Sequence, residues 1–146
     1  MTSPVPANAQ TFNFELVSPE RKILSESATM VVIPGEEGDF GVLPNHSDLM
    51  SSVRPGVVLV FLPGEAEPRK IFIAGGFADV TALNTTLLAE EAVNVNDLNQ
   101  PDLEQTIRNL TEDMALAADE TEKARAQKKL ILAKAKLTAI TGQIVT

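Results

Sequence analysis

Residues 57–74 read VVLVFLPGEAEPRKIFIA, in which two apolar runs flank a loop that begins and ends with proline. Strands are enriched in Val, Ile and Phe, whereas Pro and Gly are typical of turns, so this stretch predicts a β-hairpin. The first run, residues 57–62, has no polar residue and therefore predicts a strand buried on both faces, as between two packed sheets.

The same alternation of short apolar runs and turns extends on both sides of this hairpin. Upstream, Phe12, Phe14 and Leu16 alternate with polar residues, as in a strand with one buried face. Downstream, residues 77–83 and 86–89 flank a further turn. Many short strands separated by regular turns are typical of an antiparallel sandwich or barrel.

The last third of the chain has a different character, because residues 102–141 contain neither Gly nor Pro. Two apolar stripes with helical spacing run through it: Leu103, Ile107, Leu110 and Met114, then Leu130, Ala133, Leu137 and Ile140. The two stripes are out of phase, which predicts a break between about Thr111 and Asp119 and hence a helical hairpin. One long helix with an interrupted stripe is the alternative.

We therefore predict a mainly β fold with an α appendage, in which an N-terminal antiparallel β-sandwich precedes a C-terminal two-helix hairpin. The expected parts are a flexible N-terminal tail over residues 1–11, the sandwich over residues 12–97 and the hairpin over residues 98–146. The tail is predicted because its residues are small, polar or proline.

Composition excludes several classes of function. The absence of cysteine excludes disulfide frameworks, thiolate nucleophiles and zinc ribbons. The net charge of −8 and the absence of Trp and Tyr argue against nucleic-acid binding, since phosphates repel such a surface and bases find no stacking platform. The longest apolar run has six residues, where a membrane-spanning helix needs about 20, so a soluble protein of the reducing cytoplasm is expected.

No arrangement of residues predicts a catalytic, cofactor or metal site. His46, Ser47 and Asp48 are the residue types of a hydrolase triad, but consecutive residues of an extended chain point to alternating faces. An acidic loop could hold a cation, although a solvated turn is the simpler interpretation: it contains Glu36, Glu37 and Asp39. The residues alone thus predict an interaction protein that is not an enzyme.

Three stretches resemble one family. They are ELVSPE at residues 15–20, GEEGDFGVLPNHSDL at residues 35–49, and IAGGFADV at residues 73–80, with LLAEEA following at residues 87–92. This pattern strongly resembles the epsilon subunits of bacterial F-type ATP synthases, the counterparts of the mitochondrial delta subunit. The resemblance implies an N-terminal β-sandwich and a C-terminal pair of helices, as the residue patterns also predict.

The resemblance also implies a function within the proton-translocating ATP synthase. Such a subunit belongs to the central rotor stalk, where its sandwich lies at the foot of the gamma subunit and on the ring of c subunits. It couples proton flow to rotation and is itself not catalytic. Its helices can fold onto the sandwich or rise along gamma into the alpha/beta catalytic head and restrain ATP hydrolysis. The implied location is peripheral, on the cytoplasmic face of the bacterial inner membrane, with membrane contact only through the c ring.

Four residues match interface positions of the family. Ser18, His46 and Ser51 correspond to positions that face gamma, and Asp39 corresponds to an acidic position that faces the polar loops of the c ring. The helical part adds a basic run that could meet acidic loops of the catalytic head or form a solvated face: Lys123, Arg125, Lys128 and Lys129.

One departure from the family bears on nucleotide binding. Some members bind ATP through Leu/Ile-Asp-x-x-Arg-Ala at the start of the first helix, but residues 98–103 here read LNQPDL. Asn99 replaces the Asp and Asp102 replaces the Arg, and an acidic side chain should repel phosphates. No ATP binding is therefore expected at this stretch. From another class of function, the alternative is a stand-alone β-sandwich that binds a small ligand, although few aromatic residues are available to line a pocket.

Overall fold

The computed structural model describes residues 10–142, and the chain divides into two compact units between Asn94 and Val95. Each unit is considered by itself. The first nine residues of the predicted flexible tail, residues 1–11, lie outside the described part of the chain.

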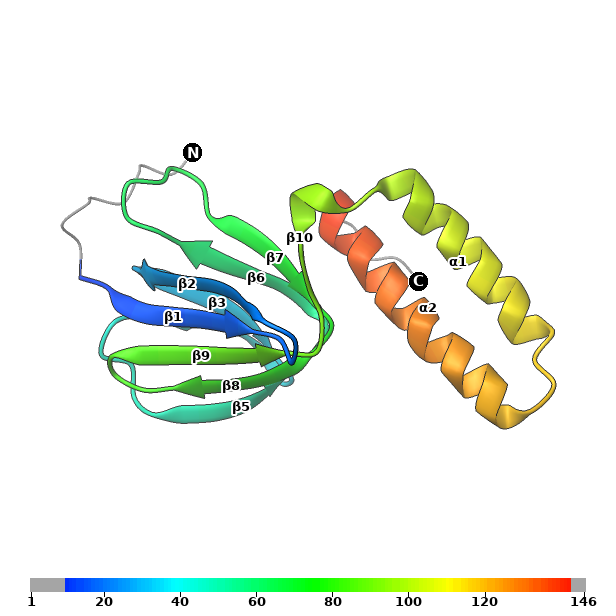
Figure 1. Ribbon diagram of the computed structural model, residues 1–146, viewed down its shortest axis with the longest axis horizontal. Helices are drawn as coiled ribbons and strands as arrows, with labels where there is room; N and C mark the ends of the chain where they lie inside the picture. The colour runs from blue at the N-terminus through cyan, green and yellow to red at the C-terminus, as the bar shows by residue number, and fades with distance from the viewer. Residues whose placement is uncertain (1–9, 143–146) are drawn as a thin grey trace. The chain divides into compact units, whose positions relative to one another are not determined.

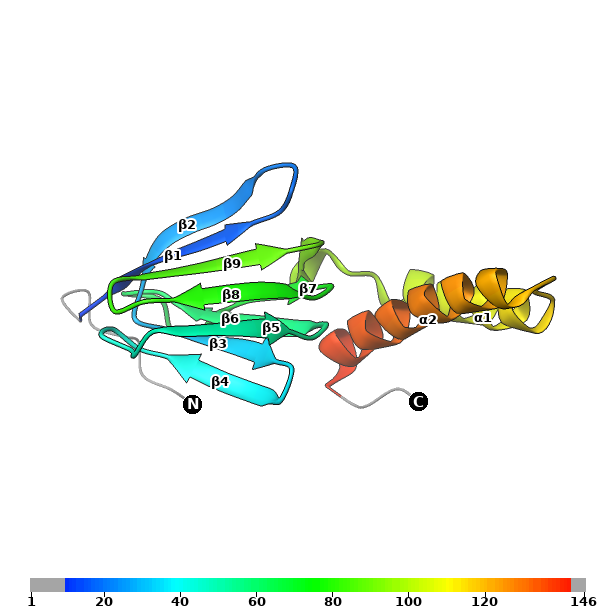
Figure 2. The ribbon, with the colours of Figure 1, turned by 90° about the horizontal axis from the view of Figure 1, so that it is seen from below.

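The first unit is built from strands alone in its described part. In chain order they are β1 (Phe12–Val17), β2 (Lys22–Ala28), β3 (Met30–Gly35), β4 (Gly38–Val42), β5 (Leu49–Val53), β6 (Gly56–Phe61), β7 (Arg69–Ile73), β8 (Gly76–Val80), β9 (Asn84–Ala89) and β10 (Ala92–Asn94). They form two layers, β5-β8-β9-β1-β2 and β4-β3-β6-β7-β10, which meet where Gly35 of β3 pairs with Val53 of β5 (Figures 1 and 2). The predicted β-sandwich is confirmed.

Strand pairing is antiparallel except between β1 and β9, which run parallel. Parallel neighbours need a long connection, and here the chain from β2 to β8 lies between them. The β1–β9 pair thereby joins the first two strands of the chain to β9 in one layer.

The strand patterns explain the core. Phe12, Phe14 and Leu16 of β1 point inward and are at most 3% exposed, as their alternation predicts. In β6, Val58 and Val60 are fully buried, whereas Val57, Leu59 and Phe61 are partly exposed, so one face of this strand is in the core and the other is only partly covered. Residues 57–60 pair with residues 69–72 of β7, which confirms the predicted hairpin.

The second unit begins with a short 3-10 helix, η1 (Val95–Asp97), and continues with α1 (Gln100–Ala115) and α2 (Glu120–Thr141). The two long helices pack against each other and are separated by residues 116–119. The break falls within the predicted interval, so the hairpin is confirmed and the single long helix is wrong.

Both helices begin at side chains that satisfy free backbone amides. Asn99 accepts a hydrogen bond from the backbone N–H of Asp102, with Pro101 in the first turn, and Asp119 accepts one from Glu122. Helix α2 ends at Thr141 and is capped by Gly142, whose left-handed φ of 73° favours glycine.

Little of the helical unit is buried. Leu130, Ala133 and Leu137 of the predicted α2 stripe are buried, whereas α1 contributes no buried residue. Within residues 10–142, neither helix combines the length and the apolar character that crossing a membrane requires.

Candidate functional site

The register of the sheet locates the four predicted interface residues in three places. Ser18 directly follows β1, and the tip of the β3–β4 hairpin, residues 35–38, lies at the same end of the sandwich, with Asp39 beside it. His46 belongs to the connection between β4 and β5 at the opposite end, and Ser51 lies in the middle of β5. The structure therefore does not bring the four residues together into one site.

The turn after β1 uses the Ser18 hydroxyl internally. Ser18 and Arg21 exchange backbone and side-chain hydrogen bonds of 2.9–3.3 Å that close the β1–β2 turn. Beside this turn lies an open cavity of about 230 Å³. Ser18 and Arg21 line it together with three carboxylate side chains, those of Glu20, Glu90 and Glu91. This end of the sandwich is thus concave and rich in carboxylates.

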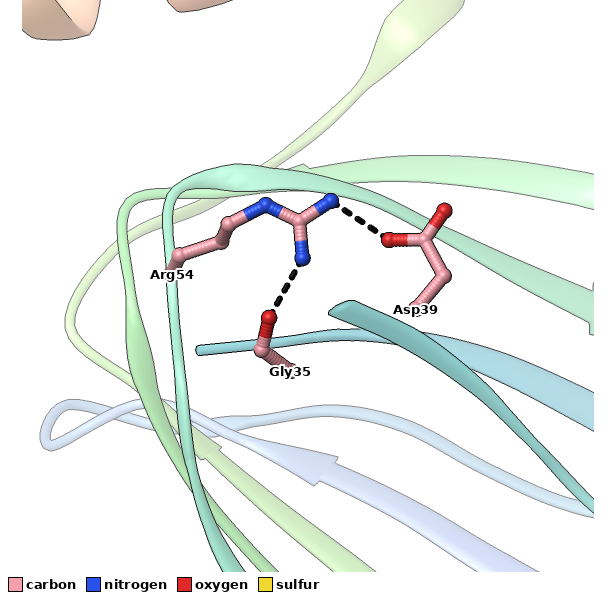
Figure 3. A network of polar contacts seen from close by, with 3 residues as sticks. All are labelled: Gly35, Asp39 and Arg54. Carbon is pink, nitrogen blue, oxygen red and sulfur yellow. Dashed lines mark hydrogen bonds and ion pairs between the residues drawn. The ribbon is translucent and has the colours of Figure 1, made fainter. Parts of the chain in front are cut away.

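The β3–β4 tip is tied to the end of β5 by a network of polar contacts (Figure 3). The Arg54 guanidinium donates one hydrogen bond to the Gly35 carbonyl and another, of 2.5 Å, to Oδ1 of Asp39. The Asp39 side chain remains 61% exposed. A groove of about 500 Å³ runs from this tip along β5. The acidic residue that the sequence singles out is therefore already paired within its own chain.

At the opposite end, the segment around His46 is held by backbone contacts. Asn45, with a φ of 66°, donates its N–H to the Ala82 carbonyl at 2.9 Å. Nδ1 of His46 lies 2.6 Å from the backbone carbonyl of Ser47 and not against the Ser47 hydroxyl. In the described part of the chain, His46, Ser47 and Asp48 make no triad contact.

Ser51 faces the interior side of its strand, because it alternates with Met50 and lies two residues before the buried Val53. Its hydroxyl donates to the Ser52 carbonyl at 2.9 Å, and its side chain is partly buried along the groove. Ser51 therefore lines the groove and is partly exposed there.

An apolar patch on the outer face of β5, β8 and β9 is a feature that the sequence reasoning missed. We define it by Met50, Phe77 and Leu88, which are 67%, 40% and 54% exposed. Phe77 and Leu88 are directly opposite each other in the β8–β9 pair. The alternation along β8 contains the signal: Ala78 and Val80 occupy the inward positions, so Phe77 between Gly76 and Ala78 must point outward. Exposed apolar patches of this kind mark protein–protein contacts.

The described residues contain no cluster of metal-ligating side chains, and the stretch that corresponds to the ATP-binding pattern begins a helix. Between residues 10 and 142, no three His, Asp or Glu side chains converge as metal ligands. In the stretch that departs from the ATP-binding pattern, the Asn99 side chain is used to cap α1 and the Asp102 side chain lies in the first turn. Both residues thus act in starting the helix.

Comparison with known proteins identifies both units. Residues 11–95 match the family model of the β-sandwich domain of the ATP synthase delta/epsilon chain, and residues 100–145 match that of the C-terminal domain of the ATP synthase epsilon chain. An ATP synthase epsilon chain of Rhodospirillum rubrum is 43% identical over 92% of this chain and 99% of its own length. One from Maricaulis maris is 47% identical over 81% of this chain and 87% of its own length.

Solved structures support the fold independently. A subunit in the mitochondrial ATP synthase structure of Euglena gracilis, which comprises OSCP, F1 and the c-ring, superimposes with a TM-score of 0.74 at 22% identity, covering 90% of this chain and 80% of that one. A subunit in the central stalk and c-ring structure of the Tetrahymena thermophila mitochondrial ATP synthase gives a TM-score of 0.60 at 11% identity, covering 91% and 98%. With the family models matching both units in order, the chain belongs to the ATP synthase epsilon chain family.

Proposed function

We propose that this chain is the rotor subunit that links the c ring to the gamma subunit and the catalytic head in the central stalk of an F-type ATP synthase. The observation that carries the proposal is the family match over both units, together with a sandwich whose exposed features are loops and an apolar patch. A protein of this kind acts by rigid surface contact, transmitting torque between neighbours.

The chain performs no catalysis in this role. His46 contacts a neighbouring backbone carbonyl, and the serines at the candidate positions are bonded to backbone carbonyls within their own turns or strands. An activated nucleophile requires a base within hydrogen-bonding reach of its hydroxyl, which these contacts do not provide. The chemistry of ATP synthesis then belongs to other subunits.

The long face that carries the apolar patch contacts gamma. A single partner that reaches both Ser18 and His46 must extend from one end of the sandwich to the other, and the patch of Met50, Phe77 and Leu88 lies on a sheet between those ends. Apolar side chains surrounded by polar loops are the usual composition of a specific interface. Ser51 lies on the other face of β5, so a partner on this face reaches it only around the edge of the sheet, from the groove.

The β3–β4 tip with Asp39 meets the c ring. The tip is exposed and acidic, and charged loops give a contact electrostatic complementarity and specificity. The chain is then peripheral on the cytoplasmic face of the bacterial inner membrane and touches the membrane only through the c ring. The bacterial origin of its relatives supports this location.

The helical hairpin regulates ATP hydrolysis without sensing ATP through residues 98–103. So few of its side chains are buried that separating α1 from α2 costs little compared with unfolding the sandwich. Removing residues 102–146 and measuring ATP hydrolysis by the whole complex tests this role. A faster rate without the hairpin supports restraint, and an unchanged rate contradicts it.

Reconstitution tests the function as a whole. The ATP synthase is stripped of this subunit in inverted membrane vesicles, and the full-length protein is added back. We expect restored ATP-driven proton pumping, because the stalk regains its link to the c ring. If pumping stays uncoupled although the added protein is folded, the proposal fails. The alternative of a stand-alone ligand-binding sandwich is not favoured, because the family match includes both units.

A further inference from the structure

We propose that Arg54 is a positioning residue for the β3–β4 tip, and that Asp39 acts on the partner through Arg54 and not by direct contact with it. The inference rests on the proposed function for the identity of the partner, the ATP synthase complex. It concerns which side chains give the tip its shape and its charge.

The geometry around Arg54 connects three parts of the chain. Its side chain donates to the Gly35 carbonyl of β3 and to the Asp39 carboxylate of β4 (Figure 3). Its backbone N–H donates to the Pro34 carbonyl at 2.9 Å. Arg54 itself joins the end of β5 to the start of β6. A planar guanidinium suits this task because its donors point in fixed directions toward two acceptors.

The tip has few other restraints. Strand β4 lies at an edge and pairs with β3, and the pair of Gly35 with Gly38 is its last one. Beyond it, Glu36 donates its backbone N–H to the Ser52 carbonyl at 3.1 Å. Edge strands and loop tips are the least stable parts of a sheet, so a side chain that bridges both strands of the hairpin restricts the tip considerably.

This geometry changes the expected electrostatics of the tip. The carboxylate of Asp39 lies 2.5 Å from a guanidinium nitrogen, so its charge is compensated within the chain. Glu36 and Glu37 are exposed, and no ion pair to them is found within residues 10–142. The uncompensated negative charge of the tip therefore belongs to these two residues, and Asp39 fixes where they point.

The competing explanation makes the opposite prediction about Arg54. If Asp39 bound a basic loop of the partner directly, Arg54 would compete with that loop for the same carboxylate. Removing Arg54 would then leave binding unchanged or strengthen it, and removing Asp39 would weaken binding whether Arg54 is present or not. A positioning role instead predicts that each change weakens binding by releasing the tip, so that the two effects do not add in the double variant.

A double-mutant cycle separates the two explanations. Affinity of the full-length protein for ATP synthase stripped of this subunit is measured for wild type, Asp39→Asn, Arg54→Met and the double variant. We expect each single change to weaken binding by up to about fivefold, the range of a partly exposed charged pair, and the double variant to bind no worse than Arg54→Met. Arg54→Lys should recover only part of the loss, because it keeps the positive charge but not the two fixed donors that reach Gly35 and Asp39 together.

Two results of the binding measurement overturn the inference. In the first, Asp39→Asn weakens binding equally in the Arg54→Met background; in the second, Arg54→Met binds at least as tightly as wild type. Arg69→Met is the matched control, since Arg69 forms a similarly exposed pair with Glu65 at the other end of the sandwich, and it should leave binding unchanged.

A readout on the free protein keeps the inference distinct from the proposed function. Hydrogen exchange at the Glu36 amide should accelerate in Asp39→Asn and Arg54→Met and not in Arg69→Met, because that amide bonds across to Ser52. If wild type does not bind the stripped complex, the proposed function fails, while unchanged exchange at Glu36 overturns the role of Arg54.

Discussion

Replacing Gly76 by alanine should destabilise the sandwich more than the same substitution at any other described glycine with a positive φ. Gly76 begins β8 and pairs with Val53 on one side and Ala89 on the other. Its φ is +157°, and a Cβ added there would lie 2.0 Å from the carbonyl oxygen of Leu88. That oxygen belongs to the backbone of β9, so no side chain can rotate away to relieve the contact.

The magnitude follows from these contacts. Real Cβ atoms essentially never approach within 3.0 Å of another atom, so β9 must move by at least about 1 Å at this point. A backbone conformation that is rare for alanine costs about 1–3 kcal/mol, and each ladder hydrogen bond that the shift breaks costs about 1 kcal/mol. We expect a loss of about 3–5 kcal/mol, a large part of the 5–15 kcal/mol that stabilises a typical domain.

Gly64→Ala is the control, because Gly64 also has a positive φ, of +78°, but has nothing within 4 Å of the added methyl. It should lose only about 1 kcal/mol. The assay is urea unfolding followed by amide NMR signals of Phe14 and Ile73, which report the sandwich core separately from the helices; the protein has no Trp or Tyr for fluorescence. If the two variants differ by less than about 1 kcal/mol, the steric argument is wrong.

Four other predictions use the remaining features of the two units. Thr85→Val should raise the free energy of unfolding by about 1 kcal/mol in the same titration, because Thr85 is 1% exposed and its hydroxyl finds no partner among the described residues; a loss would contradict this. Asp119→Ala should reduce hydrogen-exchange protection in the first turn of α2 by about 1 kcal/mol, whereas Asp119→Asn should not; equal protection in the two variants would contradict the role of the cap. Phe77→Asp should weaken rebinding to the stripped ATP synthase at least about tenfold, whereas Leu83→Asp, at a more exposed residue outside the patch, should not; equal effects would remove the patch from the interface. Calorimetry of the full-length protein with magnesium-free ATP should give no saturable heat at sub-millimolar concentration, and a saturable isotherm would contradict the argument from residues 98–103.

The elements of the fold were predictable wherever the signal is local. The alternation of residues 12–16 predicts β1, and the turn residues between the two apolar runs of residues 57–74 predict the hairpin of β6 and β7. The helix break was also predictable, because Asp119 is a capping residue at the point where the apolar stripe changes phase. Each of these signals acts between residues that are close in sequence.

Features that depend on long-range pairing were not predictable in this way. The parallel pairing of β1 with β9 depends on closure of the whole sandwich, and the pattern of neither strand encodes it. The contact between Asp39 and Arg54 is similar, because the residues are 15 apart and meet only when β5 ends beside the β3–β4 tip. The same register separates His46 from Ser18, which spacing along the chain could not reveal.

Rotation is the most direct measurement of the central claim that this subunit turns with the stalk. Because the protein has no cysteine, Glu67→Cys in the exposed β6–β7 loop gives a unique attachment site for a fluorescent bead. In immobilised ATP synthase that hydrolyses ATP, we expect the bead to rotate together with a probe on gamma. A bead that stays still while gamma rotates would contradict the assignment of this subunit to the rotor.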